Sequence, residues 1–591
     1  MKDFLKMLGA SLTAMLIYGF LGSIMMLICF SGFAGLFSIE PPLPFMPSKA
    51  VLTIDMSQIT LTEQTSEIPM VDMLQTAEPL QPLGVLDAIA AINSASNDPA
   101  VKYIFLKPDA ATGGMAQMEE IRNALENFRL NGKAVISYIE NPTNAGYYLA
   151  SVSDRIFMTS YDGGMNMFSG MSSQLIFLKD ALDRLGINVQ LIRHGKYKSA
   201  GETFIRNSSS KENMQQTEEM IDSMWDSWAT AIASSRGLKK EDIDRMLNDL
   251  ELVLPQDFLE KGLVDDLLTL DQLQDKLAMF FMADNYSEVR SISIQDYAKL
   301  NTTGNPRSRK KIAVIYAEGE IVDGDAMEQV AGDRFARLIQ KVRQDDDVKA
   351  VVLRVNSPGG SVLASEKIKA QIDSLDVPVI ASYGDYAASG GYWISAGCDF
   401  IYANESTLTG SIGVFSMVPD LQSTIKDKLH VNITPVNSNP HADMYGMMRP
   451  LDKQEADFMQ ASVERIYDKF TQIVAEGRNM SVSDVDAIAQ GRVWTGTQAL
   501  EIGLVDAIGT LDDAILHAAL LIDEENGLKN IHVAEYPKPL TTMDMFTAML
   551  GGGELPDVSE PFKNIYSAFK TWDDSQSGKV YARLPYVIDI K

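Results

Sequence analysis

The feature that most constrains the fold of this chain is an internal repeat, because two copies of one sequence pattern must build two copies of one domain. Segments of the first half recur in the same order in the second half, about 245 residues later. The matching pairs are DPAVKYIFLKPDAATGG with DDVKAVVLRVNSPGG (98–114 and 346–360), NAGYYLASVSDRIFM with SGGYWISAGCDFIYA (144–158 and 389–403), FLKDALDRLGINV with TIKDKLHVNI (177–189 and 424–433), and FLEKGLVDDLLTLDQL with ALEIGLVDAIGTLDDAI (258–273 and 499–515). These matches predict two tandem domains, over residues 40–284 and 312–535.

The remaining segments are short. Residues 285–311 are predicted to link the two copies, because NTTGNP and the basic RSRKK within them are typical of loops between domains. Residues 536–591 follow the second copy as a C-terminal extension. The amino-terminal segment 1–39 precedes the first copy and differs from everything after it in composition.

Each copy alternates short apolar runs with amphipathic segments. In the second copy, KIAVIYAEGEI, AVVLRV and VPVIASY have the composition of strands, and the last two are mostly apolar, as strands buried in a parallel sheet are. DRFARLIQKVRQ and SEKIKAQIDSL have helical spacing. Strands that alternate with helices predict an α/β fold of stacked βαβ units.

The amino-terminal segment predicts a membrane anchor. Residues 7–39 carry no charge, Lys2 and Lys6 precede them, and Glu40 follows. Such a stretch is long enough to cross a bilayer, and the lysines before it favour a cytoplasmic amino end with the rest of the chain outside. A signal peptide cleaved near Ala34 is the alternative, although its apolar core is ordinarily shorter.

Charge and cysteine content exclude several classes of protein. The net charge is −28, so nucleic acid is not expected as a partner, because phosphate binding requires a basic face. The two cysteines, Cys29 and Cys398, do not indicate a disulfide framework. The five histidines are scattered and form no cluster with cysteine, so neither a metal nor another cofactor is expected.

Two small-residue turns in the second copy point to a catalytic site. NSPGGS (356–361) follows a buried strand, and its glycines leave backbone N–H groups at the start of the next helix, where they suit a developing oxyanion. Ser389, in GDYAASGGYW, follows the next strand. Because both loops emerge at the same edge of a parallel sheet, a nucleophile and oxyanion donors are expected to meet there. An N-cap serine and an ordinary turn are the alternatives.

A serine nucleophile needs a general base. His194 and His441 are the best placed of the histidines, but neither lies in an obvious active-site context. A lysine can serve if it is kept neutral, which requires its pKa to fall from ~10.4 toward ~7, a change of about 4 kcal/mol. Burial among apolar groups and hydrogen-bond acceptors can supply that shift.

Four motifs together resemble one peptidase family. YAASGGYWIS, NSPGGS and TLTGSIGV of the second copy, and GKYKSAGETFIR of the first, are similar to the serine–lysine peptidases of family S49, the signal peptide peptidase A (protease IV) family, in its long, duplicated form. The resemblance covers most of the chain. It implies two tandem crotonase/ClpP-like superhelices of ββα units after an N-terminal transmembrane helix. It also implies a homotetramer on the outer, periplasmic side of the cytoplasmic membrane, which degrades signal peptides left after cleavage and other extended peptides.

The resemblance assigns roles by motif position. Ser389 would be the nucleophile, and Lys198, in KYKSAGE of the first copy, would be the general base. Lys196 is the rival base, two residues away. Ser411, in TLTGSIGV, resembles the family serine that orients the lysine amine.

The two copies divide these residues between them. Where the second copy has Ser389, the first has Asn144, which cannot attack a carbonyl; where the first copy has Lys198, the second reads NPHADMYG, without a lysine. One dyad per chain, built from both copies, is the simplest interpretation. The backbone N–H groups of Gly360 and Gly390 are expected to hold the oxyanion.

Two functions of other classes stay open at the level of sequence. A crotonase-like acyl-CoA enzyme would use the same glycine-turn donors, although such enzymes are ordinarily single-copy and lack an anchor. A non-catalytic, membrane-associated scaffold would use Ser389 only as a helix cap.

Overall fold

A computed structural model describes residues 43–68, 79–327, 329–539 and 581–583 of the chain. The chain divides into two compact units, Met1–Phe45 and Met46–Lys591, and the second unit contains both sequence repeats. The predicted anchor over residues 7–39 lies outside the described residues. Among the residues that are described, no helix combines the length and the apolar character that crossing a membrane requires.

The first repeat forms an α/β unit around a parallel sheet. Its strand order is β8-β6-β5-β4-β1-β9, and all of these pairs are parallel. The strands are β1 (Ala50–Asp55), β4 (Val101–Lys107), β5 (Ala134–Ile139), β6 (Arg155–Met158), β8 (Asp266–Leu267) and β9 (Ser291–Ser293). Apolar side chains of α3 (Val85–Asn97) and α4 (Met115–Leu130) pack with the strands in one core. Burial of both sheet faces explains the continuous apolar runs in the sequence.

The second repeat builds a sheet of the same order. Its strands run β19-β17-β15-β13-β10-β21; in addition, β16 pairs with β15, and β20 pairs with β16. They are β10 (Lys311–Glu318), β13 (Val348–Ser357), β15 (Val379–Ala388), β16 (Phe400–Ala403), β17 (Leu408–Gly410), β19 (Val493–Thr495), β20 (Ala507–Ile508) and β21 (His532–Tyr536). Helices α13 (Gly332–Arg343) and α14 (Val362–Ile372) pack in one core, and α19 (Leu511–Ile522) packs in another. The α/β architecture with two tandem copies is confirmed.

The segment expected as a linker takes part in the first sheet. Residues 285–311 contain η1 (Tyr286–Glu288), β9 and α12 (Ile294–Ala298). β9 pairs in parallel with β1, as β21 pairs with β10 in the second repeat. The basic end of this segment continues directly into β10, which begins at Lys311.

A third sheet contains strands of both repeats and of the C-terminal extension. Its order is β12-β11-β14-β22-β18-β7. The strands are β7 (Asn188–His194), β11 (Ile321–Val322), β12 (Val330–Ala331), β14 (Gly359–Ser361), β18 (Val414–Asp420) and β22 (Tyr581–Arg583). β7 of the first repeat pairs antiparallel with β18 of the second over its whole length. The two repeats therefore share a continuous backbone hydrogen-bond network.

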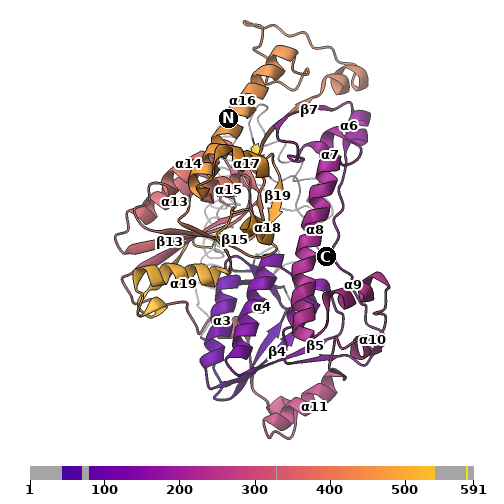
Figure 1. Ribbon diagram of the computed structural model, residues 1–591, viewed down its shortest axis with the longest axis vertical. Coiled ribbons are helices and arrows are strands. Elements are labelled where there is room, and N and C mark those ends of the chain that lie inside the picture. Colours follow the sequence, from indigo (N-terminus) through magenta and orange to yellow (C-terminus); the bar gives the residue numbers. More distant parts are fainter. Residues whose placement is uncertain (1–42, 69–78, 328, 540–580, 584–591) are drawn as a thin grey trace, which may run out of the picture. The chain divides into compact units, whose positions relative to one another are not determined.

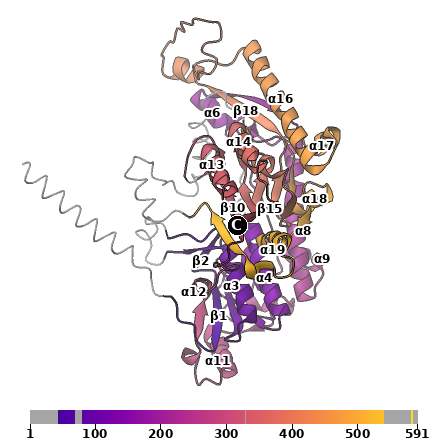
Figure 2. The same ribbon diagram turned by 90° about the vertical axis from the view of Figure 1, so that its left-hand side faces the viewer.

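Two long helices complete the assembly. α8 (Lys211–Arg236) contacts α5 and α9 of the first repeat and β19 of the second, and Figure 1 shows it running alongside elements of both repeats. α16 (Lys453–Arg478) packs against β7 and β18, beside which it is seen in Figure 2. The other elements are β2 (Ile59–Thr62), β3 (Gln81–Gly84), α5 (Asn144–Ala150), α6 (Lys179–Leu185), α7 (Glu202–Ile205), α9 (Lys240–Asn248), α10 (Pro255–Glu260), α11 (Leu270–Phe280), α15 (Gly390–Ser395), η2 (Thr424–Lys428), α17 (Val482–Ile488), α18 (Gly496–Glu501) and η3 (Gly527–Asn530).

Candidate active site

Ser389 lies at the end of β15, where the chain turns into α15. Its φ is 56°, a value that few residues other than glycine adopt, and its N–H donates to Gly410 O at 2.8 Å. Although Ser389 occupies the N-cap position of α15, its side chain makes no capping hydrogen bond. Capping therefore does not account for this buried serine, and an unusual backbone conformation at such a residue is typical of functional sites.

Lys198 of the first repeat reaches Ser389 across the repeat boundary. Its amine nitrogen Nζ lies 2.8 Å from Ser389 Oγ, 3.0 Å from Ser411 Oγ and 3.1 Å from Ser411 O. The pairing of β7 with β18 explains this approach, because Lys198 follows the end of β7 and Ser411 precedes the start of β18. The structure thus brings together three of the residues singled out in the sequence.

The surroundings of the Lys198 amine favour its neutral form. The side chain is 0% exposed, and burial lowers the pKa of Lys198 well below its ordinary value. The three oxygen atoms around Nζ belong to two hydroxyls and a carbonyl, so none of them adds the negative charge that would favour an ammonium ion. A neutral amine at hydrogen-bonding distance from a serine hydroxyl can accept its proton.

Glycines hold the backbone of Lys198 in place, and the sequence analysis missed them. A Cβ built on Gly491 would lie 2.6 Å from Lys198 Cβ, and one built on Gly413 would lie 3.2 Å from Lys198 Cδ. Gly491 N donates to Ile412 O at 2.7 Å, which ties the turn before β19 to the loop after Ser411. Any side chain at position 491 would displace the lysine. The sequence contains no signal for this role, because the two segments are far apart along the chain.

The two glycines predicted as oxyanion donors are neighbours. A Cβ built on Gly390 would lie 3.1 Å from Gly360 N and 3.2 Å from Gly359 Cα. Gly360 has a φ of 155°, and a Cβ at this position would lie 2.0 Å from Ile321 O, so the turn admits only glycine. The turn after β13 therefore lies against the first residue of α15, next to Ser389.

The other candidate bases lie in different surroundings. Lys196 is exposed, and its Nζ lies 4.9 Å from the centre of the Tyr197 ring. His194 stacks on the ring of Tyr467, with 3.9 Å between ring centres. These contacts direct both side chains to aromatic rings rather than to Ser389.

Asn144, the counterpart of Ser389 in the first repeat, has a structural role. Its Oδ1 accepts hydrogen bonds from Ser169 N and Gly170 N at 3.1 Å each, and its Nδ2 donates to Gly170 O at 2.9 Å. The side chain therefore holds the loop that follows β6.

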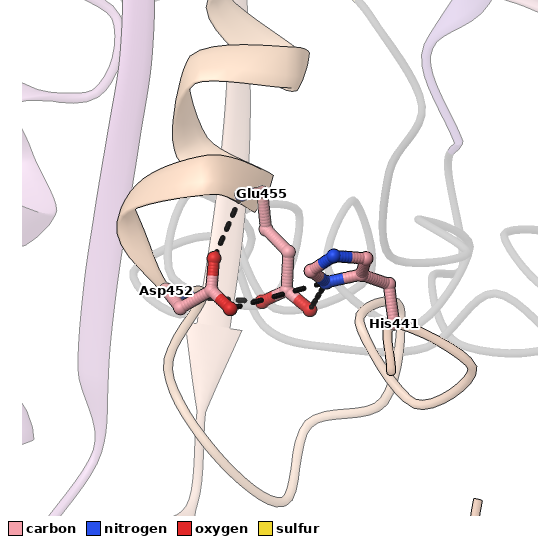
Figure 3. A group of neighbouring side chains, drawn as sticks. All are labelled: His441, Asp452 and Glu455. Atoms are coloured by element: carbon pink, nitrogen blue, oxygen red, sulfur yellow. Dashed lines mark hydrogen bonds and ion pairs between the residues drawn. The ribbon is translucent and has the colours of Figure 1, made fainter. Parts of the chain in front are cut away.

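His441 belongs to an ion-pair cluster (Figure 3). Within the described parts of the chain, His441, Asp452 and Glu455 form the one group of His, Cys, Asp or Glu side chains that could offer three ligand atoms within 4.8 Å of one another. His441 Nδ1 lies 2.9 Å from Glu455 Oε1, and Arg449 donates to both oxygens of Glu455 at 2.7 Å. Asp452 and Glu455 also cap the start of α16. Because Arg449 already neutralises Glu455, the cluster is complete without a cation.

Comparison with known proteins agrees with this arrangement. The family model "Peptidase family S49" matches residues 127–280 and 372–524, one stretch in each repeat. Protease 4 of Haemophilus influenzae is 36% identical over 459 residues, which cover 75% of this chain and 74% of that protein. Protease 4 of Salmonella typhi is 34% identical over 490 residues, covering 81% and 78%. The chloroplastic serine protease SPPA of Arabidopsis thaliana is 30% identical over 467 residues, covering 77% and 68%.

The matched stretches contain both halves of the candidate site. The first includes Lys198 and the second includes Ser389 and Ser411. The sequence left three functions open, and all three of these relatives are named as proteases. The peptidase prediction is therefore confirmed. The chain belongs to peptidase family S49 and is a serine peptidase.

Proposed function

We propose that the chain is an endopeptidase that uses Ser389 as nucleophile and Lys198 as general base. The observation that carries the proposal is the 2.8 Å distance between Lys198 Nζ and Ser389 Oγ in a fully buried setting. A base at this distance can take the serine proton as the hydroxyl oxygen attacks the scissile carbonyl. Ser411 supports the assignment, because its hydroxyl and carbonyl oxygens orient the amine.

The remaining steps use the same groups. The carbonyl carbon of the substrate becomes tetrahedral and its oxygen gains negative charge, which the N–H groups of Gly360 and Gly390 are proposed to stabilise. The lysine, now an ammonium ion, donates a proton to the leaving amine as the peptide bond breaks. A water molecule then loses a proton to the neutral lysine and attacks the acyl-serine, which releases the second product and restores both residues.

Extended peptides fit this site as added strands. β22 lies antiparallel to β14, pairing Gly359 with Arg583 and Gly360 with Ala582, and it also pairs with β18. The edges of β14 and β18 thus accept an extended segment beside the Gly360 turn, as the sheet edges of peptide-binding proteins do. We propose that signal peptides released by prior cleavage are substrates, since a relative from Enterococcus faecium is named a putative signal peptide peptidase SppA.

The cellular setting belongs to the same proposal. The uncharged stretch at 7–39, preceded by two lysines, is proposed as a single transmembrane anchor with the catalytic unit on the periplasmic side of the cytoplasmic membrane. We propose further that the two repeats are crotonase/ClpP-like superhelices of ββα units and that four chains assemble. Cross-linking of the purified, detergent-solubilised protein tests the tetramer.

The catalytic proposal is tested with a chromogenic peptide and a fluorophosphonate label. Ser389→Ala and Lys198→Ala should each lower kcat by at least a thousandfold, and Ser389→Ala should abolish labelling. Ser395→Ala is a matched control, because Ser395 is a buried serine of α15 that donates to Gly391 O. Wild-type turnover in Ser389→Ala would refute the proposal.

A further inference from the structure

One carboxylate of the second repeat occupies a glycine turn of the first. Asp385 Oδ1 accepts a hydrogen bond from Ala116 N at 2.9 Å, in the first turn of α4. A Cβ built on Gly114 would lie 1.7 Å from Asp385 Oδ2, so the carboxylate rests directly on this glycine. The N-terminus of α4, a helix of 16 residues, favours negative charge, and no acidic residue of α4 itself lies in its first turn.

The occupied turn is the counterpart of the proposed oxyanion turn. TGG (112–114) aligns with PGG (358–360), and each of these turns lies between a buried strand and a helix. In the second repeat this turn lies beside Gly390 and the nucleophile. In the first repeat, which has Asn144 in place of a nucleophile, the Asp385 carboxylate lies against Gly114 of the equivalent turn and accepts its hydrogen bond from Ala116 N, two residues further on.

Asp385 lies where β15 leaves its regular pairing. The ladder between β13 and β15 pairs Val355 with Tyr383 and resumes with Ser357 and Ala387, so residues 384–386 bulge opposite a single residue of β13. Asn356 Oδ1 accepts from Tyr386 N at 3.1 Å within the bulge. Bulges next to active sites redirect the side chains that follow them, and here Ser389 follows three residues later.

After the bulge, Tyr386–Ala388 pair with β17, so Asp385 lies immediately before the paired residues that lead to Ser389. The contact from Asp385 to Ala116 joins the bulge to the repeat that supplies Lys198. Because the distance between the two dyad atoms depends on the placement of both repeats, a contact between the repeats so close to Ser389 can control it.

We propose that Asp385 is a positioning residue, whose carboxylate docks against Gly114 and the first turn of α4 in the first repeat and thereby holds Ser389 in line with Lys198. This inference rests on the proposed serine–lysine mechanism. It gives the glycine turn of the first repeat a role as a docking point for the second repeat.

Burial and the nearby Glu63 carboxylate raise the pKa of Asp385 to about 6, whereas the Ala116 N–H and Arg354 favour its charged form. The electrostatic neighbours of Asp385 are Glu63, Glu120 and Arg354, and Glu318 is affected by Asp385 in turn. Glu63, Glu120 and Arg354 form buried ion pairs among themselves. The Ala116 N–H is thus a direct hydrogen-bond donor to Asp385 in a region that already contains several carboxylates.

The test compares Asp385→Ala, Asp385→Asn and Gly114→Ala in the full chain. Asp385→Ala should lower kcat and the rate of fluorophosphonate labelling by on the order of 10–100-fold, with KM changed less than about threefold. Asp385→Asn should recover most of the activity, because its side-chain carbonyl can still accept from Ala116 N. Gly114→Ala should behave like Asp385→Ala, since its methyl group displaces the carboxylate.

A double-mutant cycle distinguishes positioning from general destabilisation. If both changes break one contact, the Gly114→Ala/Asp385→Ala variant should be no slower than either single variant. Gly163→Ala and Asp457→Ala are matched controls and should keep wild-type kcat: a Cβ on Gly163 meets nothing within 4 Å, and Asp457 pairs only with the exposed Lys453 among the ion pairs found.

Three results would overturn the inference: wild-type kcat in Asp385→Ala, no recovery in Asp385→Asn, or additive losses in the cycle. If Asp385→Ala does not fold, Asp385→Asn and Gly114→Ala still decide the question. Ser389→Ala and Lys198→Ala are assayed in parallel. If these two variants are inactive while Asp385→Ala has wild-type kcat, the positioning role of Asp385 is wrong and the proposed dyad stands. If Ser389→Ala is active, the dyad itself is wrong.

Discussion

At the scale of single residues, the charge state of one lysine should control the rate. Burial lowers the pKa of Lys198, so the neutral amine becomes the dominant form at a lower pH than for an exposed lysine. Because only the neutral form can accept the Ser389 proton, kcat/KM should rise as pH passes upward through this lowered pKa. Lys198→Arg should lose at least a thousandfold in kcat/KM at every pH from 6 to 10, since a guanidinium stays protonated over that range.

The measurement is kcat/KM against pH for the wild type and three variants on one peptide. Lys196→Arg is the matched control, because Lys196 is exposed and should tolerate the change with an unaltered profile. Ser411→Ala should retain more activity than Lys198→Arg and should shift the rising limb, as it removes a hydroxyl 3.0 Å from Nζ. A Lys198→Arg variant with wild-type activity would exclude Lys198 as the base.

A second buried residue makes stability depend on pH. Burial raises the pKa of Glu119 to about 8, and Trp228 Nε1 donates to its Oε1 at 2.9 Å. At pH values between the ordinary glutamate pKa and about 8, Glu119 is therefore protonated to a greater extent in the folded chain than in the unfolded chain. It follows that the contribution of Glu119 to the free energy of unfolding falls as pH rises through this window, and is most favourable below it.

Glu119→Gln should remove this dependence, because glutamine is neutral at every pH. The free energy of unfolding of the wild type, relative to the variant, should fall by up to ~1.4 kcal/mol per pH unit between pH 5 and 8. Urea unfolding at both pH values measures the difference. Glu126→Gln, at a half-exposed position of the same helix, should show no such trend. An equal difference at both pH values would contradict the assignment.

Sequence could single out the two residues of the proposed dyad but not the residues that pack around them. Ser389 and Lys198 stand out because each repeat retains one and lacks the other, a comparison that needs no coordinates. Gly491 and Asp385 act on segments more than 200 positions away. Gly491 lies in none of the motifs singled out in the sequence, and Asp385, although it lies in GDYAASGGYW, has no sequence neighbour that points to Ala116, so these contacts appear only once the two repeats are folded together.

At the scale of elements, the order of strands and helices could be predicted and the pairing across repeats could not. Apolar runs at β13 and β15 indicated buried parallel strands, because such strands must be apolar on both faces. The pairing of β7 with β18 joins segments of different repeats, and nothing in the local composition of either specifies the other. For the same reason the linker-like composition of residues 285–311 did not reveal β9.

Removal of the C-terminal extension should free the peptide-binding edge. β22 occupies the position between β14 and β18 that an extended substrate is proposed to take. Deletion of residues 540–591 should therefore raise kcat/KM for a short extended peptide by on the order of tenfold, equivalent to about one or two net hydrogen bonds. Steady-state kinetics of the two chains at one pH measures the change.

A point variant tests whether β22 competes with the peptide substrate, without shortening the chain. Arg583 Nη1 lies 3.4 Å from Glu320 Oε1. Arg583→Glu would place a second negative charge beside Glu320, and the repulsion should loosen β22 in the full-length chain. It should change kcat/KM in the same direction as the deletion. A deletion variant with unchanged or lower kcat/KM would show that β22 does not compete with the peptide.

At the scale of the whole molecule, buried charge joins the two repeats. Arg354 of β13 donates from Nε to Glu63 Oε2 at 2.6 Å and from Nη1 to Glu120 Oε1 at 2.7 Å, and the side chains of all three are 0% exposed. Both carboxylates come from the first repeat and the guanidinium from the second. Such a cluster adds little net stability over apolar packing, but loss of one partner leaves uncompensated charge in the interior.

Arg354→Met should therefore destabilise the chain by about 3–5 kcal/mol, because it leaves Glu63 and Glu120 without their cation. Addition of Glu63→Gln and Glu120→Gln should recover much of that loss, as the remaining groups are then neutral. Arg337→Met is the matched control: Arg337 and Asp325 form an exposed pair, so its loss should cost less than about 1 kcal/mol. Urea unfolding of the four chains at pH 8 gives these differences. A loss below 1 kcal/mol in Arg354→Met would mean that the repeats are held together by the β7–β18 pairing and apolar packing alone.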